Sequence, residues 1–331
     1  MIDIWSLLER AFGWGGVVAY HGVGDSPPVP VMHVSPPQLR AQLKRLRDNH
    51  RILPLRELVD RWHANTSTRD CVAITFDDAY AGVMVHALPI LRELEIPATV
   101  FVTSDHAALG GSYWWDDVAR NSTPGSSSRR TVIDALGLSK DDLDTSTAGG
   151  MDRIRNIVLA RFAGRWPGGV AAGGDTVWRS LNFRELEALA AEELIDFAVH
   201  TLSHPALPLL AYDEQVAEIR ENFRLLQKKL PRVLPVVAYP YGLYDGATVR
   251  AAREAGMIAG VTMEGRAAAD HPDPMTVPRI GAGDIHSPGS LTLRLNRALR
   301  PALVIRNGGA HPRIPIDISS RRQHNGRPTG S

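Results

Sequence analysis

Hydrophobic residues recur along this chain in two alternating patterns. Short apolar runs rich in Val, Ile and Phe predict buried strands. They lie at Val17–Tyr20, Cys71–Phe76, Ala98–Val102, Asp196–Val199, Val236–Tyr239 and Ile258–Thr262. Stretches with apolar positions at three- and four-residue intervals predict helices over Pro36–Asn49, Leu55–His63, Val85–Glu93, Asn182–Glu192, Tyr212–Lys229 and Gly246–Glu254. The alternation predicts an α/β protein with a parallel sheet, either open or closed into a barrel.

Polar residues stand just after several of the predicted strands. They are His21, the pair Asp77 and Asp78, His200, and the segment 239–242. The carboxyl ends of parallel strands meet at one end of an α/β barrel, and active sites are built there. We therefore expect these residues to share one site.

His200 and His204 are four residues apart, so both imidazoles can lie on one side of a turn or helix start. A carboxylate from elsewhere can complete a His-His-Asp metal site. Successive side chains diverge at the end of a strand, so one residue of the pair Asp77 and Asp78 can bind the ion while the other acts as a base. Such a site suits a divalent ion, Zn²⁺ best of all, and also accepts Co²⁺, Ni²⁺ or Fe²⁺.

Three segments together resemble one known family. Thr75–Asp78, His200–Pro205 and the aromatic-Pro-Tyr-Gly segment in Ala238–Gly242 are similar to successive motifs of the polysaccharide deacetylases, also called NodB-homology or carbohydrate esterase family four proteins. The resemblance runs from Tyr20 to about Gly281. It implies an irregular (β/α)7-type barrel with a helical insertion between the first two motifs.

The resemblance also implies roles for individual residues. Asp78, His200 and His204 match the metal ligands of the family, and Asp77 matches the general base. The backbone N–H of Tyr241 matches the donor that stabilises the oxyanion. The expected activity is hydrolysis of the N-acetyl group of an amino sugar.

Two histidines are candidates for the general acid. The segment Val18–Val23 contains Tyr-His and resembles the opening of a family branch with permuted motif order, which includes biofilm poly-N-acetylglucosamine deacetylases. In that branch the first strand delivers the acid, which favours His21. An imidazole has an ordinary pKa near 6.5 and is suited to this role. His286 is the alternative, although it lacks the Leu that the usual carboxyl-terminal motif places two positions earlier.

Three further residues are predicted to contact substrate. Tyr239 and Pro240 belong to the third motif, and Trp114 begins the predicted insertion. A Trp can stack on a sugar ring, but a Trp pair near the start of a helical insertion is more often an anchor that packs the insertion down. Both interpretations of Trp114 remain open at the level of sequence.

Two positions depart from the family pattern. Ala238 stands where many members carry an Arg that orients the catalytic Asp, and Arg279 is a candidate replacement. Ala79 replaces the usual Gly after the Asp pair. If that position requires a positive φ, the alanine strains the turn.

The sequence also predicts an arrangement of segments. We expect an amino-terminal helix at 1–16, a catalytic domain at 17–300 with a helical and loop insertion at 105–180, and a disordered tail at 301–331. Six other histidines are expected to be solvated or to form local hydrogen bonds. They are His33, His50, His63, His86, His106 and His271.

Composition narrows the possible partners. The 331 residues are 44% hydrophobic, and 37 Lys and Arg against 36 Asp and Glu give a net charge of +1. No global basic field therefore attracts nucleic acid or anionic membrane. The single Cys71 excludes an internal disulfide. No secretory signal and no apolar run of about 20 residues is recognised, so we expect a cytoplasmic protein without a transmembrane segment.

Three functions are compatible with these patterns. The first is a metal-dependent hydrolase that removes the N-acetyl group from an amino-sugar glycan or sugar conjugate. The second keeps the metal site but acts on a non-sugar amide, namely a formamide, cyclic imide or ureide. The third is a glycan-binding pseudo-enzyme, which is disfavoured because the proposed ligands and base are all present.

Overall fold

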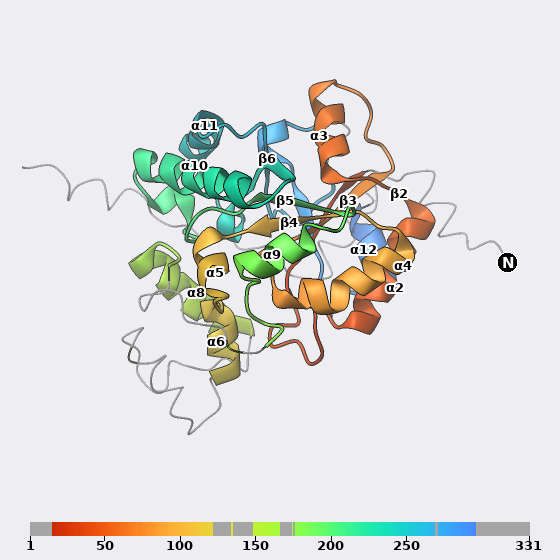
Figure 1. Cartoon of the computed structure of the whole chain (residues 1–331), viewed down its shortest axis with the longest axis horizontal. Helices are drawn as coiled ribbons and strands as arrows, with labels where there is room; N and C mark the ends of the chain where they lie inside the picture. Colours follow the sequence, from red (N-terminus) through yellow and green to blue (C-terminus); the bar gives the residue numbers. More distant parts are fainter. Residues whose placement is uncertain are drawn as a thin grey trace, which may run out of the picture.

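The computed structural model describes residues 15–121, 134, 148–165, 174, 176–268 and 271–295. Its strands form one eight-stranded parallel sheet in the order β7-β6-β5-β4-β3-β1-β8, with β2 paired to β3 (Figure 1). The strands are β1 Gly16–Tyr20, β2 Arg51–Ile52, β3 Cys71–Phe76, β4 Ala98–Val102, β5 Ile195–Val199, β6 Val233–Ala238, β7 Ala259–Val261 and β8 Arg279–Gly281.

The two ends of the sheet approach each other. β8 lies beside β1, with Val17 opposite Arg279. Just before β8, Val277 bridges to Val261 of β7. The sheet is therefore a nearly closed barrel, as the alternating pattern and the family resemblance predict.

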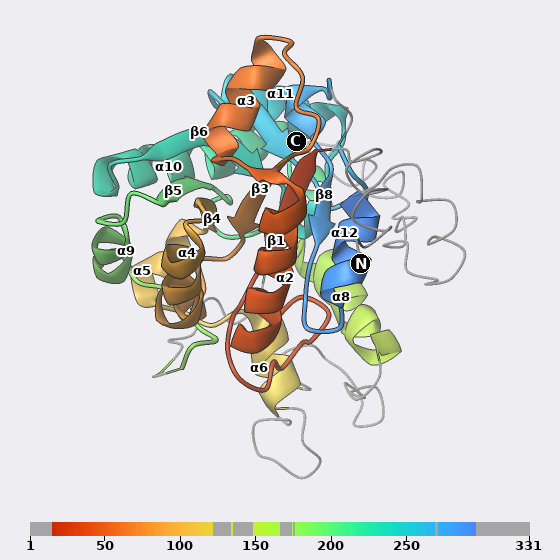
Figure 2. The same ribbon diagram turned by 90° about the vertical axis from the view of Figure 1, so that its right-hand side faces the viewer.

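Helices cover the outside of this barrel. α10 packs against α11, and α2 packs against α12 (Figures 1 and 2). The main helices are α2 Pro36–Asn49, α3 Leu55–His63, α4 Leu88–Leu94, α9 Phe183–Leu189, α10 Tyr212–Lys229, α11 Gly246–Glu254 and α12 Pro288–Leu295. A π-helical turn, η1 Val83–Ala87, precedes α4 and takes the first three residues of the single helix predicted at 85–93.

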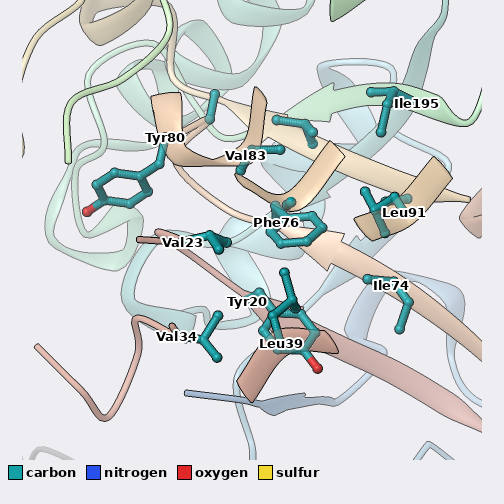
Figure 3. Close-up of a cluster of buried hydrophobic side chains, with 14 of the residues drawn as sticks. Tyr20, Val23, Val34, Leu39, Ile74, Phe76, Tyr80, Val83, Leu91 and Ile195 are labelled. Atoms are coloured by element: carbon teal, nitrogen blue, oxygen red, sulfur yellow. The ribbon is translucent and has the colours of Figure 1, made fainter. Parts of the chain in front are cut away.

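Strand side chains alternate between two cores. Val18 and Ile74 belong to the outer core beneath the helices, in which Tyr20 stacks on Phe76 at 5.5 Å between ring centroids (Figure 3). Residues one position earlier, such as Ala73, belong to an inner core with side chains from strands around the sheet. Continuing this alternation puts position 77 on the inner side, at the carboxyl end of β3.

The insertion contributes three helices among the described residues. They are α5 Ser104–Leu109, α6 Trp114–Asn121 and α8 Ala148–Phe162. Both views place α6 and α8 at the same end of the molecule (Figures 1 and 2). Within the described part of the chain, no helix is long and apolar enough to span a membrane.

The predicted terminal segments are only partly within the described residues. Gly16 already belongs to β1, so the amino-terminal helix expected at 1–16 cannot extend to that residue. Residues 1–14 and the tail at 301–331 lie outside the described residues. Asp245 caps the start of α11, because its side chain accepts a hydrogen bond from the Thr248 N–H at 2.8 Å.

His50 gives the fold a pH-dependent stability. It is buried at the end of α2, and among the described residues neither ring nitrogen has a hydrogen-bond partner. Burial, with a contribution from the positive Arg45, lowers the pKa of His50 to about 4. Between about pH 6.5 and pH 4, His50 is therefore protonated in the unfolded chain but neutral in the folded one. The free energy of unfolding falls as the pH falls through that window.

We expect His50→Gln to reduce this acid destabilisation by about 1 to 2 kcal/mol at pH 5. The measurement is urea denaturation of both proteins at pH 7.5 and pH 5. His63→Gln is the matched control, because His63 is exposed at the end of the neighbouring helix. Equal losses of stability in the wild type and His50→Gln would contradict the prediction.

Candidate active site and metal centre

Asp77 and Asp78 follow β3 and are both almost fully buried. Asp78 and Ala79 have positive φ angles, 68° and 50°. This left-handed turn separates the directions of the two carboxylates. The alanine therefore occupies the conformation that glycine tolerates best, at a cost of about 1 to 2 kcal/mol. The strain anticipated at Ala79 is present in the structure.

The carboxylate of Asp78 meets the two histidines that follow β5. Its Oδ1 atom lies 3.5 Å from Nε2 of His200 and 3.6 Å from Nε2 of His204. All three side chains are buried, and their potential ligand atoms lie within 4.8 Å of one another. The structure thus brings together the three residues predicted to bind metal.

Hydrogen bonding prepares this cluster for a cation. His200 Nδ1 donates to the Ala238 carbonyl at 2.8 Å, which leaves the lone pair of Nε2 facing Asp78. Among the described residues, Asp78 Oδ1 has no hydrogen-bond partner. A buried carboxylate oxygen without a donor is costly, and a metal ion satisfies it. The donor set of two imidazoles and one carboxylate fits Zn²⁺.

Electrostatics point the same way. Burial lowers the pKa of His200 and of His204, so both imidazoles stay neutral and able to bind a cation. Burial and the neighbouring charge of Asp77 raise the pKa of Asp78 well above its ordinary value. In the absence of a cation, the ionised form of Asp78 is therefore unfavourable, and a bound dication would stabilise it.

Asp77 has a different partner. Arg279 on β8 donates two parallel hydrogen bonds to it, from Nη1 to Oδ1 at 2.7 Å and from Nη2 to Oδ2 at 2.6 Å. Arg279 is fully buried and also donates to Thr75 Oγ1 and the Thr262 carbonyl. Burial alone would raise the pKa of Asp77, but Arg279 holds it at about 2. Arg279 thus takes the orienting position that Ala238 leaves empty, as the sequence suggested.

His21 stands beside the same carboxylate, with Nε2 3.9 Å from Asp77 Oδ2. Burial lowers the pKa of His21 to about 3, although the negative charge of Asp77 opposes the shift. The alternative acid, His286, accepts a hydrogen bond from the Gly283 N–H through Nδ1 within its own turn. Of the two candidates, the structure places His21 against the predicted base.

The third motif forms a tight turn, Pro240–Gly242, in which Tyr241 has a positive φ of 59°. The Tyr241 ring lies 4.8 Å from the His204 ring, between centroids. Its hydroxyl donates to the Gly164 carbonyl at 2.6 Å and accepts from Trp114 Nε1 at 3.1 Å. The insertion therefore holds Tyr241 from the start of α6 and from the turn that follows α8.

The three residues predicted to contact substrate are buried among other side chains. Tyr239 is fully buried, stacks on Tyr244, and donates to the Met275 carbonyl at 2.9 Å. Pro240 is buried, and Trp114 is only 7% exposed. The structure does not bring the Tyr239 side chain to the metal cluster. Trp114 follows the anchoring interpretation, because its indole N–H is bonded to Tyr241.

Sequence reasoning missed part of the site's surroundings. His33 was expected to be solvated or locally bonded, but it is fully buried and bonded to Asp116 at 2.7 Å. Trp115, the neighbour of the flagged Trp114, lies 5.2 Å from the His204 ring, between centroids. Tyr113 donates to the Asp78 carbonyl at 2.9 Å. The aromatic and acidic run at 113–117 was the available signal, because such a run seldom begins a solvated loop.

Comparison with known proteins finds similarity to polysaccharide deacetylases. A family profile described as polysaccharide deacetylase matches residues 64–127 and 174–260. The poly-beta-1,6-N-acetyl-D-glucosamine N-deacetylase of Staphylococcus epidermidis is 21% identical over 256 residues, which cover 75% of this chain and 67% of the relative. A Streptococcus pyogenes deacetylase solved with acetate has a similar fold, with a TM-score of 0.58 and 18% identity over 85% of this chain and 97% of its own. IcaB from Ammonifex degensii gives a TM-score of 0.57 and 18% identity over 86% and 97%. The family profile, this relative and the similar folds agree with the motifs and the barrel in pointing to the polysaccharide deacetylases.

Proposed function

We propose that the protein is a metal-dependent hydrolase that removes N-acetyl groups from an amino-sugar substrate, either an N-acetylglucosamine-type glycan or a sugar conjugate. The observation that carries the proposal is the meeting of two groups at one end of the barrel. Asp78, His200 and His204 form a potential metal site, and the Arg279-bound Asp77 lies next to it. The named activity of the Staphylococcus epidermidis relative supports the same reaction class.

The metal site suits a divalent ion. Asp78, His200 and His204 would hold it, with Zn²⁺ the best match and Co²⁺, Ni²⁺ or Fe²⁺ as alternatives. When bound, such an ion polarises the acyl oxygen and increases the acidity of a coordinated water. The remaining chemistry belongs to side chains and backbone groups of the protein.

Asp77 removes a proton from the attacking water. Arg279 keeps this carboxylate ionised and occupies both of its oxygens from one side, so its orientation is fixed. The Tyr241 N–H, in its positive-φ turn, stabilises the negative charge that forms on the acyl oxygen. Loss of one such donor typically raises the barrier by about 2.7 to 4 kcal/mol.

His21 returns a proton to the departing amine. It is neutral in the buried site, and its Nε2 lies 3.9 Å from the Asp77 carboxylate. Burial lowers the pKa of His21 and Arg279 lowers the pKa of Asp77, so neither group retains the transferred proton strongly. Donation to the nitrogen as the C–N bond breaks then completes the cycle.

The test is acetate release from short N-acetylglucosamine oligomers by Zn²⁺-reconstituted protein. We expect Asp77→Asn to lower the rate by about 10²- to 10⁴-fold, because the general base is lost. Asp60→Asn is the matched control, since Asp60 is an exposed residue of α3. Metal content is measured in all three proteins so that loss of the ion is not mistaken for loss of the base.

Two outcomes would change the proposal. If the wild type binds stoichiometric metal but releases no acetate, the substrate is a different amide or the protein binds glycan without turnover. If Asp77→Asn releases acetate at the wild-type rate, Asp77 is not the base.

A further inference from the structure

A buried hydrogen-bonded chain lies beside the catalytic groups and has no part in the mechanism so far. His33 is fully buried in the segment between β1 and α2. Its Nδ1 accepts a hydrogen bond from the Gly22 N–H at 3.0 Å, and its Nε2 lies 2.7 Å from Asp116 Oδ1. Gly22 directly follows His21, so the chain begins at the backbone of the proposed acid.

The chain continues into the insertion. Asp116, at the start of α6, is fully buried, and its second oxygen accepts from the Tyr80 hydroxyl at 2.5 Å. The Trp115 indole N–H donates to the same hydroxyl at 2.8 Å. Tyr80 lies two residues after Asp78. The network therefore joins the first motif, the insertion and the segment that carries His21.

These contacts fix the position of every proton in the network. Because the Gly22 N–H donates to His33 Nδ1, that nitrogen carries a lone pair and the proton resides on Nε2. Nε2–H then donates to Asp116, which also accepts from Tyr80. If His33 were doubly protonated, its Nδ1–H and the Gly22 N–H would be two donors facing each other without an acceptor. The network is consistent with one imidazole tautomer only.

The backbone of Gly22 is tightly enclosed. A Cβ atom built at this glycine would lie 2.8 Å from His33 Nδ1 and 2.9 Å from the Trp178 ring. On the following residues, Gly24 N–H donates to Val34 and Val34 N–H donates to Gly22. The peptide that follows His21 is thus held on one side by His33 and Trp178.

His21 itself has little side-chain support. Among the described residues, its buried Nδ1 atom has no hydrogen-bond partner, and its Nε2 is 3.9 Å from Asp77, beyond hydrogen-bond distance. Its ring orientation must therefore come from its backbone and packing. Among the backbone contacts around His21, the hydrogen bond from the Gly22 N–H to His33 is the one made to a side chain at the peptide that follows the ring.

We propose that His33 and Asp116 are positioning residues that hold His21 in place to protonate the leaving group. This inference rests on the proposed function. In the step concerned, the C–N bond of the tetrahedral intermediate breaks while a proton moves from the His21 imidazolium to the nitrogen, so an amine and acetate are released. An ester of 4-nitrophenol bypasses the step, because its C–O bond can break to give a stable phenolate without a proton.

The test compares the two substrates with one set of Zn²⁺-loaded proteins. His33→Leu removes the acceptor for the Gly22 N–H. His33→Asn restores an acceptor, because its Oδ1 stands near the place of Nδ1. The ratio of kcat for N-acetylglucosamine oligomers to kcat for 4-nitrophenyl acetate is expected to fall about 10²-fold in His33→Leu. We expect His33→Asn to recover most of this ratio, and KM to change little in either variant.

A matched control and an independent readout accompany this comparison. His50→Leu replaces another buried histidine, far from the network in sequence, and should leave the ratio at its wild-type value. Hydrogen exchange at the Gly22 amide, measured by NMR, should accelerate at least 10-fold in His33→Leu and stay slow in His33→Asn.

The outcomes separate two failures. A wild type that hydrolyses the ester but no sugar amide overturns the proposed function. A His33→Leu protein in which both rates fall equally, or in which neither falls, overturns the positioning role while leaving the proposed function intact. An unaltered exchange rate at Gly22 would also overturn it.

Discussion

Replacing Arg279 with Met is expected to lower the free energy of unfolding by about 3 to 5 kcal/mol and to reduce acetate release at least 10²-fold. The guanidinium is fully buried and is the bidentate partner of Asp77. Without it, the Asp77 carboxylate is left buried and unpaired. Its pKa then rises from about 2 toward neutral values, because burial opposes ionisation. The base loses both its charge and its orientation.

Urea denaturation and steady-state kinetics measure the two effects. Arg56→Met is the matched control, because Arg56 forms an equally short pair with Asp196 but is half-exposed on α3. Asp196 keeps a second cation, Arg232, at 3.8 Å, so loss of the Arg56 pair should cost less stability than loss of Arg279 and leave turnover unaffected.

A double variant separates charge from packing. Arg279→Met combined with Asp77→Asn removes both members of the pair, so much of the lost stability should return while turnover stays absent. If the double variant is as unstable as Arg279→Met alone, the destabilisation arises from the shape of the arginine and not from an unpaired charge.

Asp78→Asn is expected to abolish the stabilisation of the protein by Zn²⁺. At an ion concentration about 100 times its dissociation constant, binding to the folded state adds about 2.7 kcal/mol. The wild type should therefore melt at a higher temperature with Zn²⁺ than with a chelator, and acetate release should stop when the ion is removed. In Asp78→Asn the two melting temperatures should coincide.

The ion-free variant gives an equally specific result. Asp78 Oδ1 has no hydrogen-bond partner among the described residues, and the pKa of this carboxyl is raised by burial and by Asp77. An uncharged amide removes that penalty, so chelated Asp78→Asn should be at least as stable as the chelated wild type. Asp213→Asn, an exposed position on α10, should keep the full Zn²⁺ effect. A Zn²⁺ effect of wild-type size in Asp78→Asn would contradict the ligand assignment.

The sequence predicted the parts of the fold that have long periodic patterns. The bounds predicted for β3, β4, α2 and α10 coincide with those in the structure. β2 and β8 were missed, because each begins with an arginine and contains a single large apolar residue, so neither shows an apolar run. The π-helical turn at 83–87 was also missed, since its spacing differs from that of an α-helix.

The part of the candidate site that could be predicted consists of ligand-type side chains that lie close together in the sequence. His200 and His204 lie on one turn, and the Asp pair ends a strand, so the four residues could be named from local sequence. Arg279 could only be named as a candidate, because its pairing with Asp77 depends on which strand closes the barrel.

The role of His33 depends on tertiary structure alone. Its partner Asp116 is 83 residues away, in an insertion whose placement no local pattern specifies. The polar loop around His33 is typical of solvated sequence, and only the packing of α6 against that loop makes the histidine a buried acceptor.

The position of Arg279 also has a consequence for biosynthesis. The residue lies 202 positions after Asp77, on the last strand of the barrel. A ribosome that has made every proposed metal ligand and the third motif has still not made the arginine that pairs with Asp77, the proposed base. A prematurely terminated chain would therefore carry an incomplete active site. The contact between Arg279 and Asp77 can therefore form only after the last strand has been made and has closed the barrel. The proposed hydrolytic activity depends on this contact between distant parts of the chain.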